Sequence, residues 1–139
     1  MTKSWLADEK LYEGFPLLLR RPAELDTISL KSIFPILAVI THEFTKRLAN
    51  GLPEPEYNRG LADLDHELIS AFDSPKLGVI ALVETFGGER NYYYYVLTNA
   101  NVPNIISLIT ERYPNERLSW STRQDATWDF IEKYALKHF

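Results

Sequence analysis

The chain has 139 residues, 45% hydrophobic and 24% charged, which is typical of one globular domain with one continuous core. The sequence contains no cysteine, and this excludes disulfide scaffolds, thiol nucleophiles, iron–sulfur clusters and cysteine-based zinc sites. Fifteen basic residues against nineteen acidic ones give a net charge of −4, which disfavours tight binding of nucleic acid because phosphate neutralisation supplies most of that affinity.

The N-terminal segment alternates charged and apolar residues without an apolar block before a cleavage site, so no secretory signal is expected. The longest apolar run, Phe34 to Ile40, is far shorter than the ~20 residues that span a bilayer. We therefore expect a soluble, cytoplasmic protein. The first strand-like segment is Gly14–Pro22, in which Pro16 indicates a sheet edge or a strand start, and a polar connection follows to about Ser32.

The middle of the chain predicts a central strand followed by a helix. Ile36–Ile40 is continuously apolar and becomes mixed through Lys46, as in a strand that leaves the core. The loop Asn50–Pro55 contains two prolines, which resist both helix and strand. From Asn58 the spacing is helical until Asp73–Pro75. One apolar stripe of this helix contains Leu61, Leu64, Leu68, Ala71 and Phe72.

A β-hairpin is the clearest local pattern in the sequence. Leu77–Phe86 and Arg90–Leu97 are both rich in Val, Ile, Tyr and Phe, as strands commonly are. Gly87–Gly88 separates the two segments and can adopt the positive φ of a tight turn. We therefore predict a simple hairpin turn here rather than an anion-binding loop.

The C-terminal third predicts a helix, a strand and a second helix. Asn99–Asn101 followed by Pro103 is typical of a helix start, and apolar residues recur at helical spacing until Pro114. Arg117–Thr122 then alternates like a strand, and Asp125 is a plausible cap for the last helix. The apolar face of that last helix contains Trp128, Ile131, Ala135 and Leu136.

These elements run β-α-β-β-α-β between Ile36 and Thr122. This order is typical of an α+β, ferredoxin-like split β-α-β fold, in which two helices pack on one face of a mostly antiparallel sheet. The expected core covers about residues 34–123 within a single domain of residues 1–139. An additional N-terminal strand or strands and a C-terminal helix complete it. The last helix either covers the open sheet face or contacts a second protomer.

Few residues in the sequence could carry catalysis, because the common nucleophile-elbow, phosphate-loop, dinucleotide and zinc motifs are absent. His42 alternates with Ile40 and Phe44, which favours a buried, hydrogen-bonded position; an acid–base role is the alternative. Glu43 and Glu84 would form a carboxylate pair on the opposite face if their strands were neighbours. The competing function is thus a hydrolase or transferase using His42 with Glu43 or Glu84.

Asp63 and His66 lie one helical turn apart and could offer a metal two ligands. Two ligands do not make a metal site, and both residues suit a solvated helix face with local ion pairs. We therefore expect neither a metal nor a cofactor.

Four consecutive tyrosines, Tyr92 to Tyr95, must divide between the two faces of a strand. One pair then joins the core, and the other lies on the opposite face, where it could stack single-stranded RNA bases as related sheet domains do. The acidic chain favours cross-strand packing or a protein-binding surface instead. The candidate contact residues, which could equally belong to the core, are Tyr92, Tyr94, Trp120 and Trp128.

The order of several short motifs resembles a bacterial family catalogued as Domain of Unknown Function 695. The motifs are Asn50-Gly51-Leu52-Pro53, Leu64-Asp65-His66-Glu67-Leu68, Gly88-Glu89-Arg90-Asn91 with the four tyrosines, Tyr113-Pro114, and Asp125-Ala126-Thr127-Trp128. The similarity covers about residues 34 to 136, and Trp5 with Leu17–Arg21 extends it toward the N-terminus. That family has no established catalytic residues, so the resemblance implies none here.

The resemblance also implies an association with domains like the regulator of ribonuclease E activity B, a protein inhibitor of an RNA-degrading enzyme. It thereby favours an acidic, non-catalytic domain that acts through protein contacts. The expected function is a small cytoplasmic binding or regulatory module whose partner is another protein or a second copy of the chain, with nucleic acid an unlikely partner.

Overall fold

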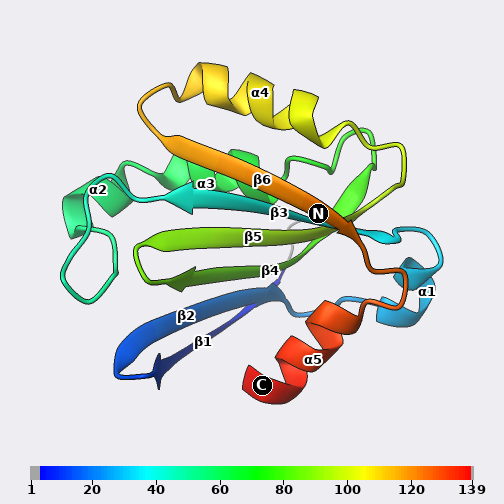
Figure 1. The fold of residues 1–139 in the computed structure, drawn as a ribbon, viewed down its shortest axis with the longest axis horizontal. Coiled ribbons are helices and arrows are strands. Elements are labelled where there is room, and N and C mark those ends of the chain that lie inside the picture. Colours follow the sequence, from blue (N-terminus) through cyan, green and yellow to red (C-terminus); the bar gives the residue numbers. More distant parts are fainter. Residues whose placement is uncertain (1–3, 139) are drawn as a thin grey trace.

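A computed structural model describes residues 4–138 of the chain, with the backbone alone for residues 135–138. The described residues form six strands and five helices (Figure 1). In chain order these elements are β1 (Trp5–Tyr12), β2 (Phe15–Pro22), α1 (Thr27–Lys31), β3 (Ile36–Glu43), α2 (Pro55–Arg59), α3 (Ala62–Ile69), β4 (Gly78–Phe86), β5 (Glu89–Val96), α4 (Val102–Arg112), β6 (Arg117–Gln124) and α5 (Asp129–His138).

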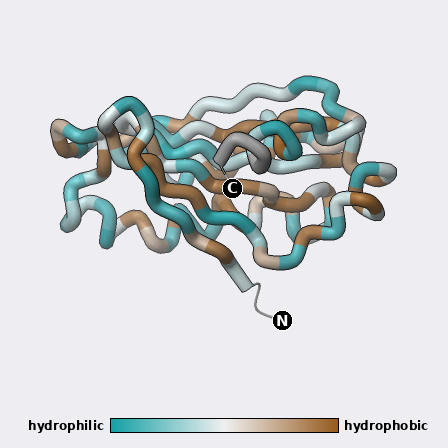
Figure 2. The backbone as a smooth tube through the Cα atoms, turned by 90° about the horizontal axis from the view of Figure 1, so that it is seen from below, coloured by the Kyte–Doolittle hydropathy of each residue, from teal (hydrophilic) through white to brown (hydrophobic). Residues whose placement is uncertain are grey.

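The strands form one sheet in the order β1-β2-β4-β5-β3-β6, and every neighbouring pair is antiparallel. The fold is therefore α+β, as predicted. Hydrophobic and hydrophilic residues follow one another along the backbone, as expected where successive side chains point to opposite faces (Figure 2). The predicted hairpin joins β4 to β5, and its Gly87 and Gly88 have φ of 64° and 89°.

One face of the sheet packs against α2, α3 and α4. Leu64 and Leu68 of α3 and Ile106 of α4 are buried against Ile40 of β3 and Tyr94 of β5. These positions are the stripes that the helical spacing predicted, so burial of apolar area accounts for the packing of this layer.

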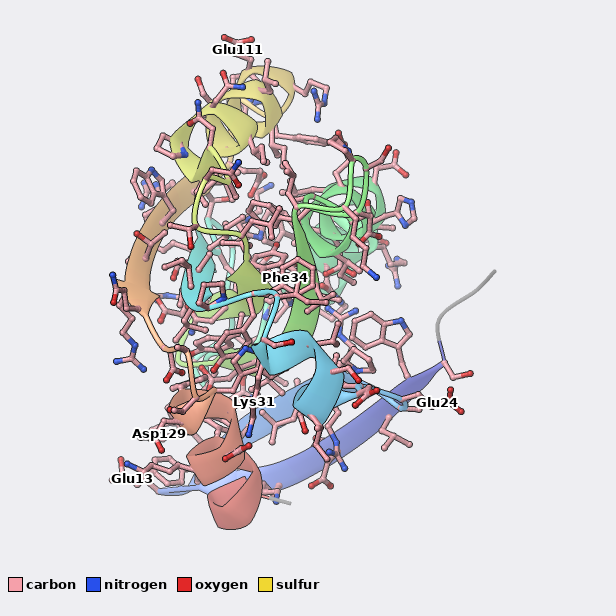
Figure 3. The ribbon with its side chains drawn as sticks, turned by 90° about the vertical axis from the view of Figure 1, so that its right-hand side faces the viewer. Glu13, Glu24, Lys31, Phe34, Glu111 and Asp129 are labelled. Carbon is pink, nitrogen blue, oxygen red and sulfur yellow. The ribbon has the colours of Figure 1, made fainter. Side chains whose placement is uncertain are left out.

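The opposite face packs against α1 and α5. Trp128, just before α5, stacks on Tyr95 with ring centroids 4.2 Å apart, and its indole N–H donates to the Phe34 carbonyl at 2.8 Å. Lys31 of α1 points toward α5, where it pairs with Glu132 (Figure 3). The C-terminal helix thus covers part of this sheet face, which was one of its two predicted roles.

Three details differ from the sequence-based expectation. The helix predicted from Asn58 is two helices, because the chain turns at Gly60 between α2 and α3. The opening residues, which favoured no element, form β1, and the polar connection contains the short helix α1. The side chains of Ala135 and Leu136, predicted to face the core, lie outside the described part of the chain. Among the described residues, no helix has the length and apolar character required to cross a membrane.

Candidate functional site

Three of the four candidate contact residues are core residues. Tyr92, Tyr94 and Trp128 each have 0% of their surface exposed, whereas Trp120 is 44% exposed. The strand order explains this, because β5 lies in the middle of the sheet with helices on both faces. Of the four, only Trp120 is available to a partner in this conformation.

The other two tyrosines of the run are covered by α5 and the residue before it. Tyr93 stacks on Phe130 at 4.7 Å, and Tyr95 stacks on Trp128. The tyrosine face suggested as an RNA-stacking surface is therefore occupied by side chains of the same chain. Burial raises the pKa of both phenols, so they remain hydrogen-bond donors at neutral pH.

His42 is buried at 1% exposure and hydrogen-bonded, as the alternation with Ile40 and Phe44 predicted. Its Nε2 lies 2.8 Å from Oε1 of Glu116, and the Tyr57 hydroxyl donates to the same carboxylate oxygen. Burial lowers the pKa of His42, although the Glu116 carboxylate opposes that effect. His42 does not line the two cavities beside Arg20 and Arg90 or the groove between β6 and α5.

The proposed acid–base partners of His42 are elsewhere. Glu43 and Glu84 project from the opposite sheet face, and β5 separates their two strands. Glu43 lies 3.4 Å from Arg117, whereas Glu84 accepts hydrogen bonds from Asn91 and Tyr134. His42 and Glu43 are neighbours on β3 and point to opposite faces of the sheet, and β5 lies between the strands that carry Glu43 and Glu84, so the fold does not bring these side chains together as acid–base pairs.

Asp63 and His66 are exposed on α3, as a solvated helix face would be. Among the side chains that the structure describes, those of residues 4–134, no group of three or more His, Asp or Glu could hold a metal ion.

A half-buried charge cluster that the sequence did not suggest joins α3 to the sheet. Arg20 of β2 donates from both terminal nitrogens to the carboxylate of Asp65, at 3.0 and 2.8 Å. The Tyr92 hydroxyl donates to Oδ1 of Asp65 at 2.5 Å. Arg90 of β5 lies 3.9 Å from the same oxygen and is 9% exposed. Two guanidinium groups therefore share one carboxylate.

Burial by itself would raise the pKa of Asp65, but the hydrogen bonds and charge of Arg20 hold that pKa below its ordinary value. Asp65 is therefore ionised at neutral pH. Two cavities adjoin the cluster and share Arg20 and Arg90. One has a volume of about 320 Å³ next to the start of α3, and the other has about 450 Å³ beside β1 and β2.

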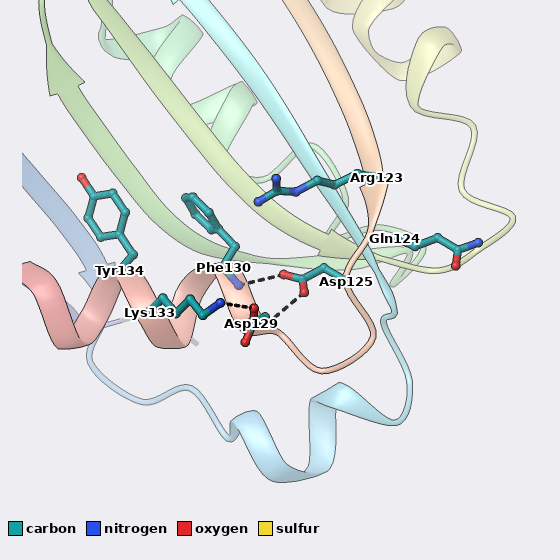
Figure 4. A pocket seen from close by; sticks show the side chains of 7 residues that line it. All are labelled: Arg123, Gln124, Asp125, Asp129, Phe130, Lys133 and Tyr134. Carbon is teal, nitrogen blue, oxygen red and sulfur yellow. Dashed lines mark hydrogen bonds and ion pairs between the residues drawn. The ribbon is translucent and has the colours of Figure 1, made fainter.

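A shallow groove of about 530 Å³ separates the end of β6 from α5 (Figure 4). Arg123 reaches toward the ring of Phe130, with its guanidinium 5.5 Å from the ring centroid, while Gln124 points away. Lys133 pairs with Asp129 at 2.8 Å, and Asp125 accepts from the N–H groups of Asp129 and Phe130. Lys133 and Asp129 are thus an ion pair, whereas Arg123 contacts a ring and Asp125 accepts backbone hydrogen bonds.

The outer strand β6 is the most open element of the sheet. It pairs with β3 along its whole length, and within the described chain no strand lies on its other side. Seven of its eight residues are exposed, all except Leu118. The strand therefore presents an uncovered backbone edge with the exposed Trp120 near its middle.

The comparisons with known proteins identify the family. A family model described as a family of unknown function, DUF695, matches residues 10–134. The chain belongs to the DUF695 family. No curated protein and no solved structure matches it. The features of this DUF695 chain that could bind a ligand or partner are the charge cluster, the groove and the sheet edge.

Proposed function

We propose that this DUF695 chain is a non-catalytic, cytoplasmic regulatory domain that binds an extended segment of a partner protein along β6. The observation that carries the proposal is the open edge of β6, a strand of eight residues paired on one side and exposed along nearly all of its length. The buried position of His42, away from both proposed partners, supports a binding role over a catalytic one.

An edge strand points half of its backbone N–H and C=O groups away from the sheet, so an extended peptide can add to it as a further strand. Natural proteins commonly protect such edges with proline, bulges or charges. Between Arg117 and Arg123, β6 has no proline or charged residue, and its register with β3 is unbroken. The other outer strand, β1, contains Asp8, Glu9 and Lys10 and is protected by charge.

The side chains of β6 favour an acidic partner segment. Arg117 and Arg123 both lie on the α5 face of the strand, where Arg123 has a ring contact with Phe130 and no carboxylate partner within the described residues. Trp120 lies on the opposite face, and a large aromatic side chain is a frequent interface anchor. Because Arg117 already lies 3.4 Å from Glu43, we infer an extended segment with an acidic residue facing Arg123 and an apolar residue beside Trp120.

The wider architecture is compatible with this function. We propose that β3 to β6, with α3 and α4, form a ferredoxin-like core, to which β1, β2, α1 and α5 are additions. The resemblance to a family associated with regulator of ribonuclease E activity B-like domains favours the same class of function, regulation through protein contact.

The proposal is tested by selecting binders from a displayed library of random, unstructured peptides and mapping them on the labelled protein by NMR. We expect acidic peptides whose binding shifts the backbone signals of β6 and the Trp120 indole signal. Trp120→Ala should weaken these peptides at least about tenfold, in the range of interface hot spots. Ser121→Pro should also weaken them, because proline is poorly accommodated in a paired strand.

Leu108→Ala is the matched control, because Leu108 is 49% exposed on α4, outside β6. This variant should bind the selected peptides with unchanged affinity. Selected peptides that map outside β6, or that bind Trp120→Ala as tightly as the unsubstituted protein, would contradict the proposal.

A further inference from the structure

We propose that the cavity beside Arg20 and Arg90 is a binding site for a small anion that carries a phosphate or carboxylate group. This site is separate from β6 and does not depend on the peptide-binding proposal. The cavity has a volume of about 320 Å³ and is lined by Arg20, Asn58, Leu61, Ala62, Asp65 and Arg90.

The charged side chains that line this cavity are more positive than negative. Arg20 and Arg90 bring two positive charges, and Asp65 is the one acidic residue that lines the cavity. Its carboxylate is held by two hydrogen bonds from Arg20 and one from Tyr92, whereas Arg90 lies 3.9 Å away. Within the lining of this cavity one positive charge is therefore left over, on side chains that are 34% (Arg20), 11% (Arg90) and 19% (Asp65) exposed, and an anion in the cavity would balance it.

Two hydrogen bonds hold the guanidinium group of Arg90. Its Nε donates to the Thr85 hydroxyl at 2.9 Å, and its Nη2 donates to Oδ1 of Asn58 at 3.2 Å. Both acceptors are neutral, so they fix the direction of the guanidinium without cancelling its charge. The side chain of Arg90 is thus held in place beside the cavity.

The guanidinium groups have further N–H donors that a bound anion could use. The two Arg20 hydrogen bonds to Asp65 use one N–H on each terminal nitrogen, and a guanidinium has five N–H donors in total. Leu61 and Ala62 come from the start of α3, and the Leu61 amide already donates to the Asn58 carbonyl at 3.1 Å, so the donors left for a ligand are those of the guanidinium groups. A phosphate or carboxylate accepts several N–H bonds at once, and guanidinium groups match its planar oxygen pairs.

Acidic residues limit the size of this ligand. Asp8 and Glu9 line the neighbouring cavity of about 450 Å³, which shares Arg20 and Arg90 with the first one. Asp8 pairs with Lys10 at 3.1 Å, but Glu9 adds negative charge on that side. The smaller cavity therefore suits a ligand with one anionic group and no further negative charge.

The test titrates the labelled protein with inorganic phosphate and, separately, with acetate, at constant ionic strength set with sodium chloride. We expect saturable shifts of the Leu61 and Ala62 amides and of the Arg90 side-chain signal with at least one of the two anions. The stronger response identifies the preferred oxyanion. No saturable shift at these positions with either anion would overturn the proposal.

Asn58→Asp is the decisive variant. It places a carboxylate beside Arg90 with almost no change in volume, so the protein should remain folded while anion affinity falls at least tenfold. Arg59→Gln removes a positive charge from an exposed side chain outside the cavity, and it should leave affinity within about twofold. Unchanged anion binding in Asn58→Asp, or an equal loss in Arg59→Gln, would show attraction to overall charge and contradict the site.

Discussion

His42 illustrates how one buried side chain couples stability to pH. Burial places the pKa of this imidazole below its ordinary value of 6.5, even though Glu116 lies 2.8 Å away. The unfolded chain therefore binds a proton at His42 at a higher pH than the folded protein does. Because the unfolded state then holds more protons, His42 causes the free energy of unfolding to decrease as the pH falls below about 7.

We predict that His42→Gln makes the free energy of unfolding less dependent on pH between about pH 7 and pH 5, the range in which an unfolded histidine becomes charged. Urea denaturation at several pH values measures this slope. His66→Gln is the control, since His66 is exposed on α3. A slope that is equal in His42→Gln and the unsubstituted protein would contradict the assignment.

Some residue-scale features could be predicted from the sequence. The alternation of His42 with Ile40 and Phe44 predicted its burial, because the two-residue period of a strand is a local property. Its partner Glu116 is 74 positions away, and Arg20 and Asp65 are 45 positions apart. These pairs depend on which strands and helices become neighbours, and no local spacing contains that information.

At the scale of elements, Asp125 connects α5 to the sheet. Its carboxylate accepts from the N–H groups of Asp129 and Phe130, which begin α5, and from the hydroxyl of Tyr95 at 2.7 Å. One side chain thus caps the helix and satisfies a phenol whose ring is buried in β5. The capping role was predicted from sequence, whereas the bond to Tyr95 required the fold.

We predict that Asp125→Ala lowers the free energy of unfolding by about 2–3 kcal/mol, because it removes a cap and leaves the Tyr95 hydroxyl without its acceptor. Asn101→Ala removes a cap from α4 with no such phenol and should cost about 1 kcal/mol. Urea denaturation compares the two variants. Equal losses would mean that the Tyr95 bond adds nothing to the cap.

The elements predicted well are those with a strong local period. The hairpin β4–β5 consists of two apolar strands buried on both faces, and α3 and α4 each bury one regular face. One or more N-terminal strands were predicted, but β1 was not located, because most of its side chains are exposed and its charges follow no two-residue pattern. The break at Gly60 was also missed, since the apolar spacing continues from Leu61 without showing where the first helix ends.

At the scale of the whole molecule, the sheet separates two hydrophobic layers. The layer under α2, α3 and α4 contains Tyr92 and Tyr94, and the layer under α1 and α5 contains Tyr95. The central strand β5 contributes to both layers and has strands on both sides. The outer strands β1 and β6 have a partner on one side within the described chain.

We predict that backbone amides of β5 exchange with solvent most slowly, at the rate set by global unfolding, and that amides of β1 and β6 exchange at least about tenfold faster through local opening. Hydrogen–deuterium exchange followed by NMR measures each strand. Equal protection of β6 and β5 would show that the edge is already covered, for example by a second copy of the chain.

The four tyrosines of β5 also explain how a repetitive strand keeps one alignment. Shifting the strand by one residue would still place a ring where a ring had been, so ring packing alone distinguishes the alignments weakly. The hydroxyl groups distinguish them, because each has its own acceptor. Those acceptors are Asp65 for Tyr92, Glu84 for Tyr93, the Leu68 carbonyl for Tyr94 and Asp125 for Tyr95. These four hydrogen bonds therefore help to specify the register of the strand. Phenylalanine at all four positions would preserve the hydrophobic pattern but remove the hydrogen bonds.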